Sequence, residues 1–580
     1  MEISMKIENR SFDKTNYENL REAGLSDLLS RIYASRGIGS TEEITRTIKD
    51  IEGLDSMKGL KAAVDRIANA MQLSENIGIS GDFDVDGCGG ASVLIESIKK
   101  MGGKQPEIYI PDRIKQGYGL SPALVAEMPE DTDLIITVDN GISSHAGVEA
   151  ANQRGIDVII TDHHLPGETL PNAYAIVNPN QPGCNFPWKG TAGVGVAFYV
   201  IGALRSELCR RGWFEQKGIP KMSLMPLLDL VAIATVGDVA PFEQNNRIFI
   251  AEGISLIRSG NCRPGIKALM QVARRDPQHI TATDIGFTIT PRINAAGRMA
   301  DMKKGVQLML AESMDEAMPI AQELDAMNRS RQEIQQDIQE EADRILNDQV
   351  GLLGDIGYTI VVHNPEWHEG IIGIVAGRIR ETFNRPTIVL TKADNGEYKG
   401  SGRSIPGLNL RDAIAATDAR IPGVIKRFGG HAAAAGIMLE GTEEAVQRFM
   451  EAFEEVVREQ ISAEDLLETI ITDGPLVEDD LTIENIRAIE DGGPWGRGFE
   501  PPLFTGRLHL YEVQEVAKNG VKFQTRIGNK LVKGIWFRRG KSAEAPVPNA
   551  GESIACTFTP MINRFRGNES IEIMVSRVFD

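Results

Sequence analysis

The stretch from Leu25 to Asp162 alternates short apolar runs with segments of helical periodicity. Its apolar runs include NIGIS, PEIYI, DLIITVD and DVIIT, and amphipathic segments such as ASVLIESIKKMG separate them. This alternation is typical of repeated β-α-β units, because parallel strands need a helical crossover and are buried on both faces. The sequence therefore predicts a doubly wound α/β domain with a parallel sheet. Ligands in such a domain lie beyond the carboxyl ends of the strands.

The length of 580 residues is enough for several domains, each with its own core. Residues 313–350 contain no glycine and place apolar residues at helical spacing between charges, which predicts a long linking helix. A second α/β pattern follows, and short alternating strands with Gly and Asn turns then predict a small β-barrel. We therefore expect an N-terminal helical segment at 1–48, a first α/β domain at 49–312, the linking helix at 313–350, a smaller α/β domain at 351–460 and the barrel at 461–580.

Composition is that of a globular protein, with 42% hydrophobic and 25% charged residues. The five cysteines are scattered without a Cys-x-x-Cys pair, which argues against a zinc ribbon and for a reduced, cytoplasmic compartment. No apolar stretch approaches the roughly 20 residues that a membrane span needs. The polar N-terminus also lacks the apolar core of a secretory signal. We therefore expect no membrane association.

The formal net charge of −19 would make a uniformly charged surface repel nucleic acid. The acidity is concentrated, however, in residues 440–491, which hold 17 Asp and Glu against 3 Lys and Arg. Residues 497–580 instead hold 13 Lys and Arg against 8 Asp and Glu. A nucleic-acid partner is therefore not excluded. The acidic segment has two candidate roles, which are to keep strands off the wrong surface or to receive a basic partner.

An acidic loop follows the first buried run, where Asp82, Asp84 and Asp86 stand at alternate positions between NIGIS and the next helix. Three carboxylates at this spacing repel one another unless a hard cation compensates their charge. The loop begins like a calcium-binding EF-hand, which requires a glutamate at its twelfth position. Here that position is occupied by Val93. The EF-hand calcium loop is therefore excluded. The sequence favours a metal site of another kind, with a solvated acidic turn as the alternative.

Three further sites carry the same kinds of ligand. An Asp-Asn-Gly motif begins at Asp139 after one apolar run, an Asp-His-His motif begins at Asp162 after the next, and Asp238 closes the apolar helix LLDLVAIATVGD. Carboxylates with an imidazole suit Mn²⁺ or Mg²⁺ better than zinc. The pattern predicts a site for two divalent metal ions, which would hydrolyse a phosphoester or phosphoanhydride.

In order and spacing these motifs resemble those of the DHH phosphoesterase superfamily, and the chain from about Leu25 to its C-terminus resembles the RecJ exonucleases within it. The resemblance extends to SRIYASRGI, PDRIKQGYGL, VGDVAPFEQNNR, PRINAAGRM, WHEGIIGIVAGRI, GSGRS, RFGGHAAAAG and PWGRGFEPPLF. It implies a single-strand-specific DNA exonuclease of 5′ to 3′ polarity that acts in repair and recombination. It also implies a DHH domain, a DHH-associated domain and an OB-like barrel that binds nucleic acid.

The resemblance assigns roles to the acidic and histidine motifs. It implies a metal site formed by Asp82, Asp84, Asp86, Asp139, His163 and Asp238, with Asp139 bridging the ions. The implied catalytic residues are Asp84, Asp139, His163 and His164. In this assignment His164 faces the scissile phosphate and offsets the charge that develops on it, while Asp162 orients its neighbours.

Other motifs are expected to bind the substrate. Arg113 and Tyr118 pair a cation with an aromatic ring, which suits a backbone phosphate and a stacked base; a surface ion pair and a core-edge ring are the alternative. The GSGRS motif predicts a glycine-rich basic turn suited to a phosphate, which the resemblance associates with the 5′ end. The resemblance implies the further contacts Arg292, Arg298, Ser401, Gly402, Arg403, Ser404 and His431. For His431, a buried structural histidine is the alternative.

The expected substrate is single-stranded DNA, threaded between the DHH and DHH-associated domains by a monomeric enzyme. A single-strand-binding protein and a helicase are the expected partners. Two rival functions are also compatible with the sequence. One is a phosphodiesterase that acts on short oligonucleotides, and the other is a catalytically inactive DNA-binding scaffold.

Overall fold

The structure is a computed structural model that describes residues 5–45, 47–53, 56–112, 116, 118–353, 357–516, 520–537, 547–564 and 568–579, and of 348–353 the backbone alone. By its internal contacts the chain forms two compact units. One unit comprises Met1–Gly37, Ser330–Glu490 and Pro502–Asp580, and the other comprises Ile38–Arg329 and Asp491–Pro501. Each unit therefore draws on segments that are distant in sequence.

A five-stranded parallel sheet forms the centre of the unit built on Ile38–Arg329. Its strand order is β3-β2-β4-β5-β6, and every neighbouring pair is parallel. The strands are β2 (Ile77–Gly81), β3 (Glu107–Tyr109), β4 (Leu134–Val138), β5 (Asp157–Thr161) and β6 (Ala175–Val177). The doubly wound α/β domain predicted from the alternating apolar runs is confirmed.

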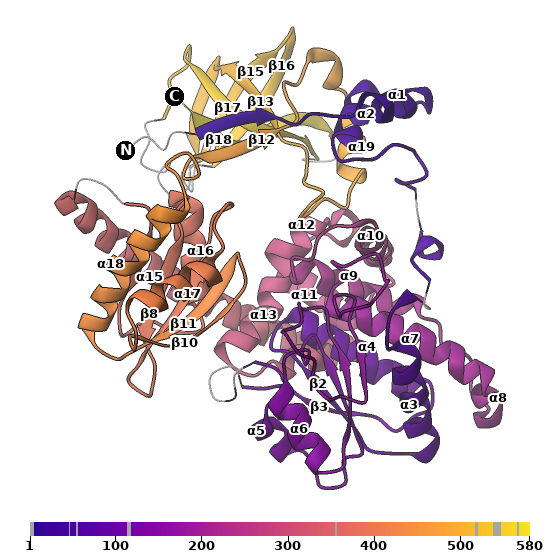
Figure 1. Ribbon diagram of the computed structural model, residues 1–580. Helices are drawn as coiled ribbons and strands as arrows, with labels where there is room; N and C mark the ends of the chain where they lie inside the picture. Colours follow the sequence, from indigo (N-terminus) through magenta and orange to yellow (C-terminus); the bar gives the residue numbers. More distant parts are fainter. Residues whose placement is uncertain are drawn as a thin grey trace. The chain divides into compact units, whose positions relative to one another are not determined.

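Helices cover both faces of this sheet because alternate strand residues point to opposite sides. Ile135 of β4 packs with the helices α5 (Pro122–Glu127) and α6 (His145–Gln153). Val138 of the same strand faces α4 (Val85–Lys100), where a Cβ on Gly90 would lie 2.4 Å from its side chain. α4 packs in turn on α7 (Gly193–Arg210) and α9 (Leu228–Gly237), as Figure 1 shows.

The remaining helices of this unit surround that core. They are η1 (Ile48–Asp50), α3 (Leu60–Leu73), α8 (Trp213–Lys217), η3 (Met225–Leu227), α10 (Gln244–Arg258), α11 (Pro264–Val272), η4 (Pro277–His279), α12 (Ala282–Asp284), the π-helix η5 (Ile285–Ile289), α13 (Thr290–Met299) and α14 (Lys303–Leu310). The predicted long helix is α15 (Met314–Leu353), whose 40 residues run through the boundary between the units at Ser330. The expected domain limits themselves stay predictions.

The second α/β pattern forms a mixed sheet of order β10-β11-β9-β8-β7. Its strands are β7 (Ile360–His363), β8 (Thr387–Lys392), β9 (Tyr398–Arg403), β10 (Ile425–Gly430) and β11 (Ala434–Leu439), and its helices are α16 (Ile372–Phe383), α17 (Leu410–Arg420) and α18 (Glu443–Gln460). Phe449 and Phe453 of α18 stack at 5.4 Å between ring centroids and lie fully buried in its core. The acidic residues of α18 are exposed except Glu454, whose carboxylate accepts hydrogen bonds from the backbone N–H groups of Tyr358 and Thr359.

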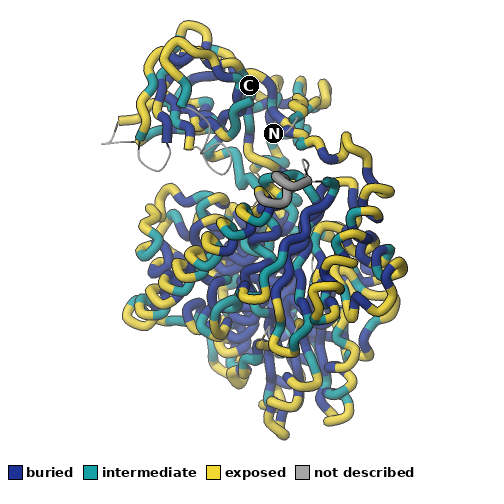
Figure 2. Tube along the Cα trace, turned by 90° about the vertical axis from the view of Figure 1, so that its left-hand side faces the viewer, coloured by how far each residue is buried: buried dark blue, intermediate teal, exposed yellow. Residues whose placement is uncertain are grey.

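The C-terminal region, for which the alternating pattern predicts a small β-barrel, forms a six-stranded sheet in the order β13-β17-β18-β16-β15-β14. Its strands are β13 (Phe504–His509), β14 (Glu512–Val516), β15 (Gly520–Ile527), β16 (Lys530–Phe537), β17 (Ser553–Asn563) and β18 (Ser570–Phe579). The helices η6 (Glu478–Asp480) and α19 (Ile483–Asp491) precede it. Inward residues of the sheet are buried and outward ones exposed, and Figure 2 shows the same contrast between inner strands and outer loops.

The N-terminal region, predicted as a helical segment, contains a strand as well as helices. Helices α1 (Lys14–Glu22) and α2 (Asp27–Ala34) are present, but β1 (Met5–Asn9) precedes them and pairs in parallel with β12 (Glu468–Thr472). Such a short strand depends on pairing with another strand, and the partner of β1 lies far away in the sequence. Nearby, Arg36 donates to both carboxylate oxygens of Asp473, at 2.7 and 3.1 Å.

Among the described residues, no helix combines the length and apolar character needed to cross a membrane.

Candidate metal centre

The acidic loop begins where β2 ends and is fixed by its own backbone. Asp84 caps α4, and its carboxylate accepts hydrogen bonds from the backbone N–H groups of Asp86 at 2.9 Å and Gly87 at 3.2 Å. Gly87 allows the loop to fold back on itself, because a Cβ there would lie 2.3 Å from the backbone nitrogen of Asp82. The three carboxylates are therefore held on one tight turn at the end of a strand and the start of a helix.

The N-terminus of α7 holds Asp86 in place. The backbone N–H groups of Gly193 and Val194 donate to its two carboxylate oxygens at 2.7 and 2.9 Å. Gly193 also lies against Asp139, since a Cβ at this glycine would be 2.8 Å from the Asp139 Cβ. The sequence prediction interpreted Gly193 and Val194 as part of a close helix packing and missed their contact with the metal-site carboxylates, although glycine permits a close approach of the backbone.

Helix α13 supports the same loop from another side. The Asn294 side-chain oxygen accepts a hydrogen bond from the backbone N–H of Val85 at 2.7 Å. A Cβ on Gly297 would lie 1.9 Å from the carbonyl oxygen of Phe83, so helix and loop are in direct contact. The PRINAAGR motif therefore supports the acidic loop, a role that the sequence prediction missed.

The ends of β4 and β5 carry the other two motifs. Asp139 follows β4 with a positive φ of 60°, and Asn140 donates to the carbonyls of Ser80 and Val138 at 3.0 and 2.8 Å, which ties β2 to β4. Asp162 follows β5, and its carboxylate accepts from the backbone N–H groups of Ile142 at 2.9 Å and of the two residues after it at 2.7 and 3.1 Å. Both motifs are therefore fixed by backbone contacts at the carboxyl edge of the sheet.

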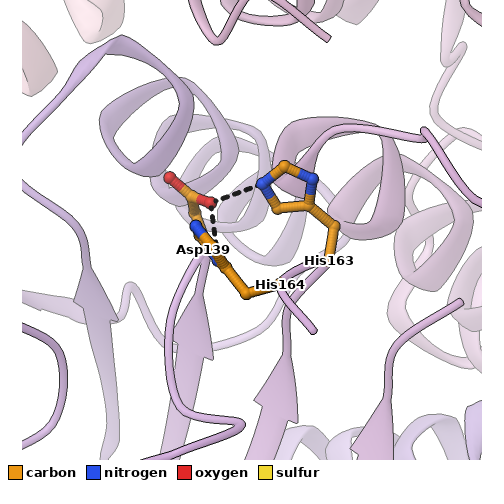
Figure 3. A group of neighbouring side chains, drawn as sticks. All are labelled: Asp139, His163 and His164. Carbon is orange, nitrogen blue, oxygen red and sulfur yellow. Dashed lines mark ion pairs between the residues drawn. The ribbon is translucent and has the colours of Figure 1, made fainter. Parts of the chain in front are cut away.

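The predicted ligands converge on this edge. His163 Nε2 lies 3.1 Å from Asp139 Oδ1, 3.8 Å from Asp86 Oδ2 and 3.9 Å from Asp238 Oδ2. His164 Nδ1 lies 2.8 Å from Asp162 Oδ1 and 3.7 Å from Asp139 Oδ1, and Figure 3 shows both histidines around Asp139. In three groups of residues, the potential ligand atoms all lie within 4.8 Å of one another. These groups are Asp139, His163 and His164; Asp86, His163 and Asp238; and Asp82, Asp84 and Asp139.

The chemistry of this cluster fits divalent cations. Among the described residues, the buried atoms Asp139 Oδ1 and His163 Nε2 have no hydrogen-bond partner. Burial and the neighbouring carboxylates raise the pKa of Asp86 and of Asp139 well above the usual value, and burial with the charge of Asp84 raises the pKa of Asp238 to about 7. A bound cation stabilises the ionised form of such clustered carboxylates. Carboxylates together with an imidazole are ligands that suit Mn²⁺ or Mg²⁺.

The two histidines have opposite electrostatic environments. Burial and the charge of His164 lower the pKa of His163 to about 4, so its imidazole is neutral, as a metal ligand must be. Burial also acts to lower the pKa of His164, but the hydrogen bond and charge of Asp162 outweigh it and raise this pKa to about 9. Asp162 therefore favours the protonated form of His164. Burial alone would raise the pKa of Asp162, and its contacts with both histidines lower it instead.

Of the two residues expected to hold a phosphate and a base, one lies beside the cluster. The Tyr118 hydroxyl donates to the carbonyl of Asp139 at 2.8 Å and lies 3.2 Å from His164 Nδ1. Its ring is about half exposed and packs edge-on against Phe83, with 6.0 Å between centroids. Tyr118 therefore lies at the rim of the metal centre. Arg113 lies outside the described residues.

The two arginines of α13 are placed differently. Arg292 Nε donates to Asp325 Oδ1 of α15 at 2.9 Å, and Arg292 also donates to the carbonyl of Thr288 at 2.5 Å. Arg298 lies half-buried in the last turn of the helix. The ion pair gives Arg292 a structural contact, and substrate binding by both residues stays a prediction.

The GSGRS motif is a strand and not the turn that its glycines predicted. Ser401, Gly402 and Arg403 belong to β9, where glycines fit because a Cβ on Gly402 would lie 2.8 Å from a side-chain carbon of Leu410. The start of α16 lies against this strand, since a Cβ on Gly373 would be 2.8 Å from Ser401 Oγ and 3.3 Å from Arg403 Nη2. A helix N-terminus, a hydroxyl and a guanidinium therefore meet at one place.

The other two residues of this group flank the same sheet. Ser404 follows β9 and is buried, and its hydroxyl donates to the carbonyl of Leu408 at 2.9 Å. His431 lies exposed in the turn between β10 and β11, where its backbone N–H donates to the carbonyl of Ala434 at 2.8 Å. The alternative of a buried structural histidine is therefore wrong.

Comparison with known proteins follows the same division of the chain. Residues 76–235 match the DHH family, N-terminal domain; residues 355–459 match the DHHA1 domain; residues 472–577 match the RecJ OB domain. The single-stranded-DNA-specific exonuclease RecJ of Escherichia coli K12 is 42% identical over 100% of both chains. The chain belongs to the RecJ family.

Other RecJ proteins agree with this membership. The RecJ of Salmonella typhimurium LT2 is 43% identical and covers 96% of each chain. The crystal structure of RecJ from Thermus thermophilus in complex with Mn²⁺ matches with a TM-score of 0.80 and 25% identity, over 99% of this chain and 79% of that one. The resemblance drawn from the motifs and the expected OB-like domain of a RecJ protein are thus confirmed.

Proposed function

We propose that the chain is a metal-dependent exonuclease that degrades single-stranded DNA from its 5′ end by hydrolysing phosphodiester bonds. The observation that carries the proposal is the convergence of five aspartates and two histidines at the carboxyl edge of one sheet. The relatives named single-stranded-DNA-specific exonucleases support the choice of substrate. The OB domain supports it as well, because such domains bind single strands through stacking and backbone contacts.

The metal ligands divide into two groups. Asp82, Asp84 and Asp139 would hold one divalent ion, and Asp86, His163 and Asp238 the other. Asp139 would contribute to holding the second ion too, since it also groups with His163. Mn²⁺ or Mg²⁺ is the proposed ion, and the similar RecJ of Thermus thermophilus is described in complex with Mn²⁺.

Two ions bound in this way would supply an activated water and neutralise charge on the phosphodiester. The protein's residues orient the reacting groups. The amides of α7 fix the Asp86 carboxylate, and Asp162 fixes the ring of His164 through Nδ1. The protonated His164 then donates to a phosphate oxygen and stabilises the charge of the transition state. Tyr118 lies at the rim and offers a ring to the base.

Single-stranded DNA that is blocked at one defined end tests the polarity of degradation and the choice of substrate. We expect a single strand blocked at its 3′ end to be degraded with Mn²⁺, the same strand blocked at its 5′ end to persist, and EDTA to abolish cleavage. Loss from the 3′ end would contradict the polarity. Cleavage restricted to very short oligonucleotides would favour the rival phosphodiesterase, and binding without any cleavage would favour the inactive scaffold.

Arg403 is proposed to anchor the 5′-phosphate, together with Ser401 and the start of α16. Arg403→Gln should slow degradation of 5′-phosphorylated strands about tenfold, because a charge-assisted hydrogen bond is lost. Strands with a 5′-hydroxyl should be much less affected. The measurement is the ratio of kcat/KM for the two strands. Arg448→Gln on the exposed face of α18 is the matched control and should leave that ratio unchanged; equal losses on both strands would remove the anchor role of Arg403.

The expected helper proteins, namely a single-strand-binding protein and a helicase, and the monomeric state stay predictions. Size-exclusion chromatography with light scattering tests the monomeric state.

A further inference from the structure

The segment 491–501 is held against the unit that carries the metal centre, although the residues before and after it belong to the other unit. The backbone N–H of Phe242 donates to the carbonyl of Arg497 at 2.7 Å. Gly496 packs directly on the Phe242 ring, because a Cβ at this glycine would lie 2.4 Å from it. The segment is therefore fixed to the loop that follows Asp238, one of the proposed ligands.

A second set of contacts makes the turn around Arg497 rigid. Gly496 and Phe499 exchange two backbone hydrogen bonds of 2.9 and 3.0 Å, and Arg497 lies between them. The rings of Trp495 and Phe499 stack at 5.0 Å between centroids. The guanidinium of Arg247, from α10, lies 3.9 Å from the centroid of the buried Phe499 ring. Aromatic stacking and a desolvated cation–π contact are specific anchors, so the backbone of Arg497 has a defined place.

The side chain of Arg497 is exposed beside the metal centre. Its Nη1 donates to the carbonyl of Val239 at 3.4 Å, and Val239 directly follows Asp238. A guanidinium carries five N–H donors, and the contact to Val239 uses one of them.

We propose that Arg497 is a substrate-binding residue that holds a backbone phosphate of the DNA strand next to the metal centre. This inference rests on the nuclease function proposed above and adds a contact from the PWGRGFEP segment to it. Bound divalent cations would compensate the carboxylates, which leaves the guanidinium for the phosphate, the anion that it pairs with best. The competing role, in which Arg497 only balances the carboxylates, predicts a change in metal requirement instead.

Arg497→Met in the full chain tests the proposal. We expect the KM for a 20-residue oligothymidylate to rise about tenfold, with kcat changed much less, because a charge-assisted phosphate contact is lost. The plot of log KM against log salt concentration should become less steep by about 0.7, the change for one phosphate contact on a single strand. Arg497→Lys should restore the salt dependence and part of the affinity, since it restores the charge without the planar fork.

Arg210→Met is the matched control. Arg210 is the exposed last residue of α7, and about 25 Å of helix separate it from the Gly193 end that contacts Asp86. This variant should keep the KM and the salt dependence of the wild type.

An Arg497→Met enzyme with unchanged KM and salt dependence would overturn the inference. So would a change confined to the Mn²⁺ concentration for half-maximal activity, which would leave Arg497 with the balancing role. Fluorescence anisotropy with the labelled oligothymidylate measures the same contact without cleavage. A wild-type chain that binds but does not degrade the strand would therefore reject the nuclease function alone, while the binding of Arg497→Met still decides the inference.

Discussion

Asp139→Asn is expected to lower kcat for Mn²⁺-dependent degradation of single-stranded DNA by about 10³-fold or more in a folded protein. Asp139 belongs to two of the three sets of ligand atoms, and its Oδ1 lies 3.1 Å from His163 Nε2. Asparagine has the same size and tolerates the positive φ of 60° at this position, but it removes the charge that a bridging ligand supplies. Nucleotide release from an end-labelled strand measures the loss, and circular dichroism confirms folding.

Glu130→Gln is the control for this variant. It removes one negative charge from an exposed position in the loop between α5 and β4, on the same unit as Asp139. The activity of Glu130→Gln should match that of the wild type. Near wild-type activity in Asp139→Asn would show that the metal centre is wrongly assigned.

Gly193→Ala should damage the metal centre without removing any ligand. The added Cβ would lie 2.8 Å from the Asp139 Cβ and 2.9 Å from Asp86 Oδ2, so α7 must shift and weaken its two hydrogen bonds to Asp86. Groups that orient a metal ligand typically contribute about 10- to 100-fold to metal affinity. We therefore expect the Mn²⁺ concentration for half-maximal activity to rise about 10- to 100-fold.

A titration of activity with Mn²⁺ measures this effect, and thermal denaturation checks that the fold is kept. Gly167→Ala is the matched control, because this glycine is exposed and the nearest atom to an added Cβ is 3.9 Å away. An unchanged Mn²⁺ requirement in Gly193→Ala would contradict the proposed role of α7.

Local patterns were enough to predict the parallel sheet and the residues at its edge. Apolar runs indicated the strands, and the rule that ligands lie beyond carboxyl ends of parallel strands then grouped Asp82, Asp139 and His163. The structure brings these residues together as expected. The prediction succeeded because strand order and strand direction alone fix which loops meet at one edge.

Contacts between distant segments could not be predicted in this way. Nothing near the acidic loop indicates that Asn294 supports it or that the start of α7 holds Asp86. The GSGRS glycines predicted a turn, whereas Ser401 lies in a strand whose glycines make room for neighbouring side chains. The same glycine pattern is compatible with a turn and with a crowded strand. Only the side chains that surround the segment in the folded protein distinguish the two structures.

The sequence by itself therefore determined the fold class, the long helix and the chemical type of the metal centre, since these depend on periodicity and on ligand chemistry. Tertiary structure alone decided how the ligands are oriented, that β1 pairs with β12, and that the segment carrying Arg497 lies beside Asp238. Those features depend on packing between segments separated by hundreds of residues. Their physical basis is the surface that each segment meets after folding, which no local pattern contains.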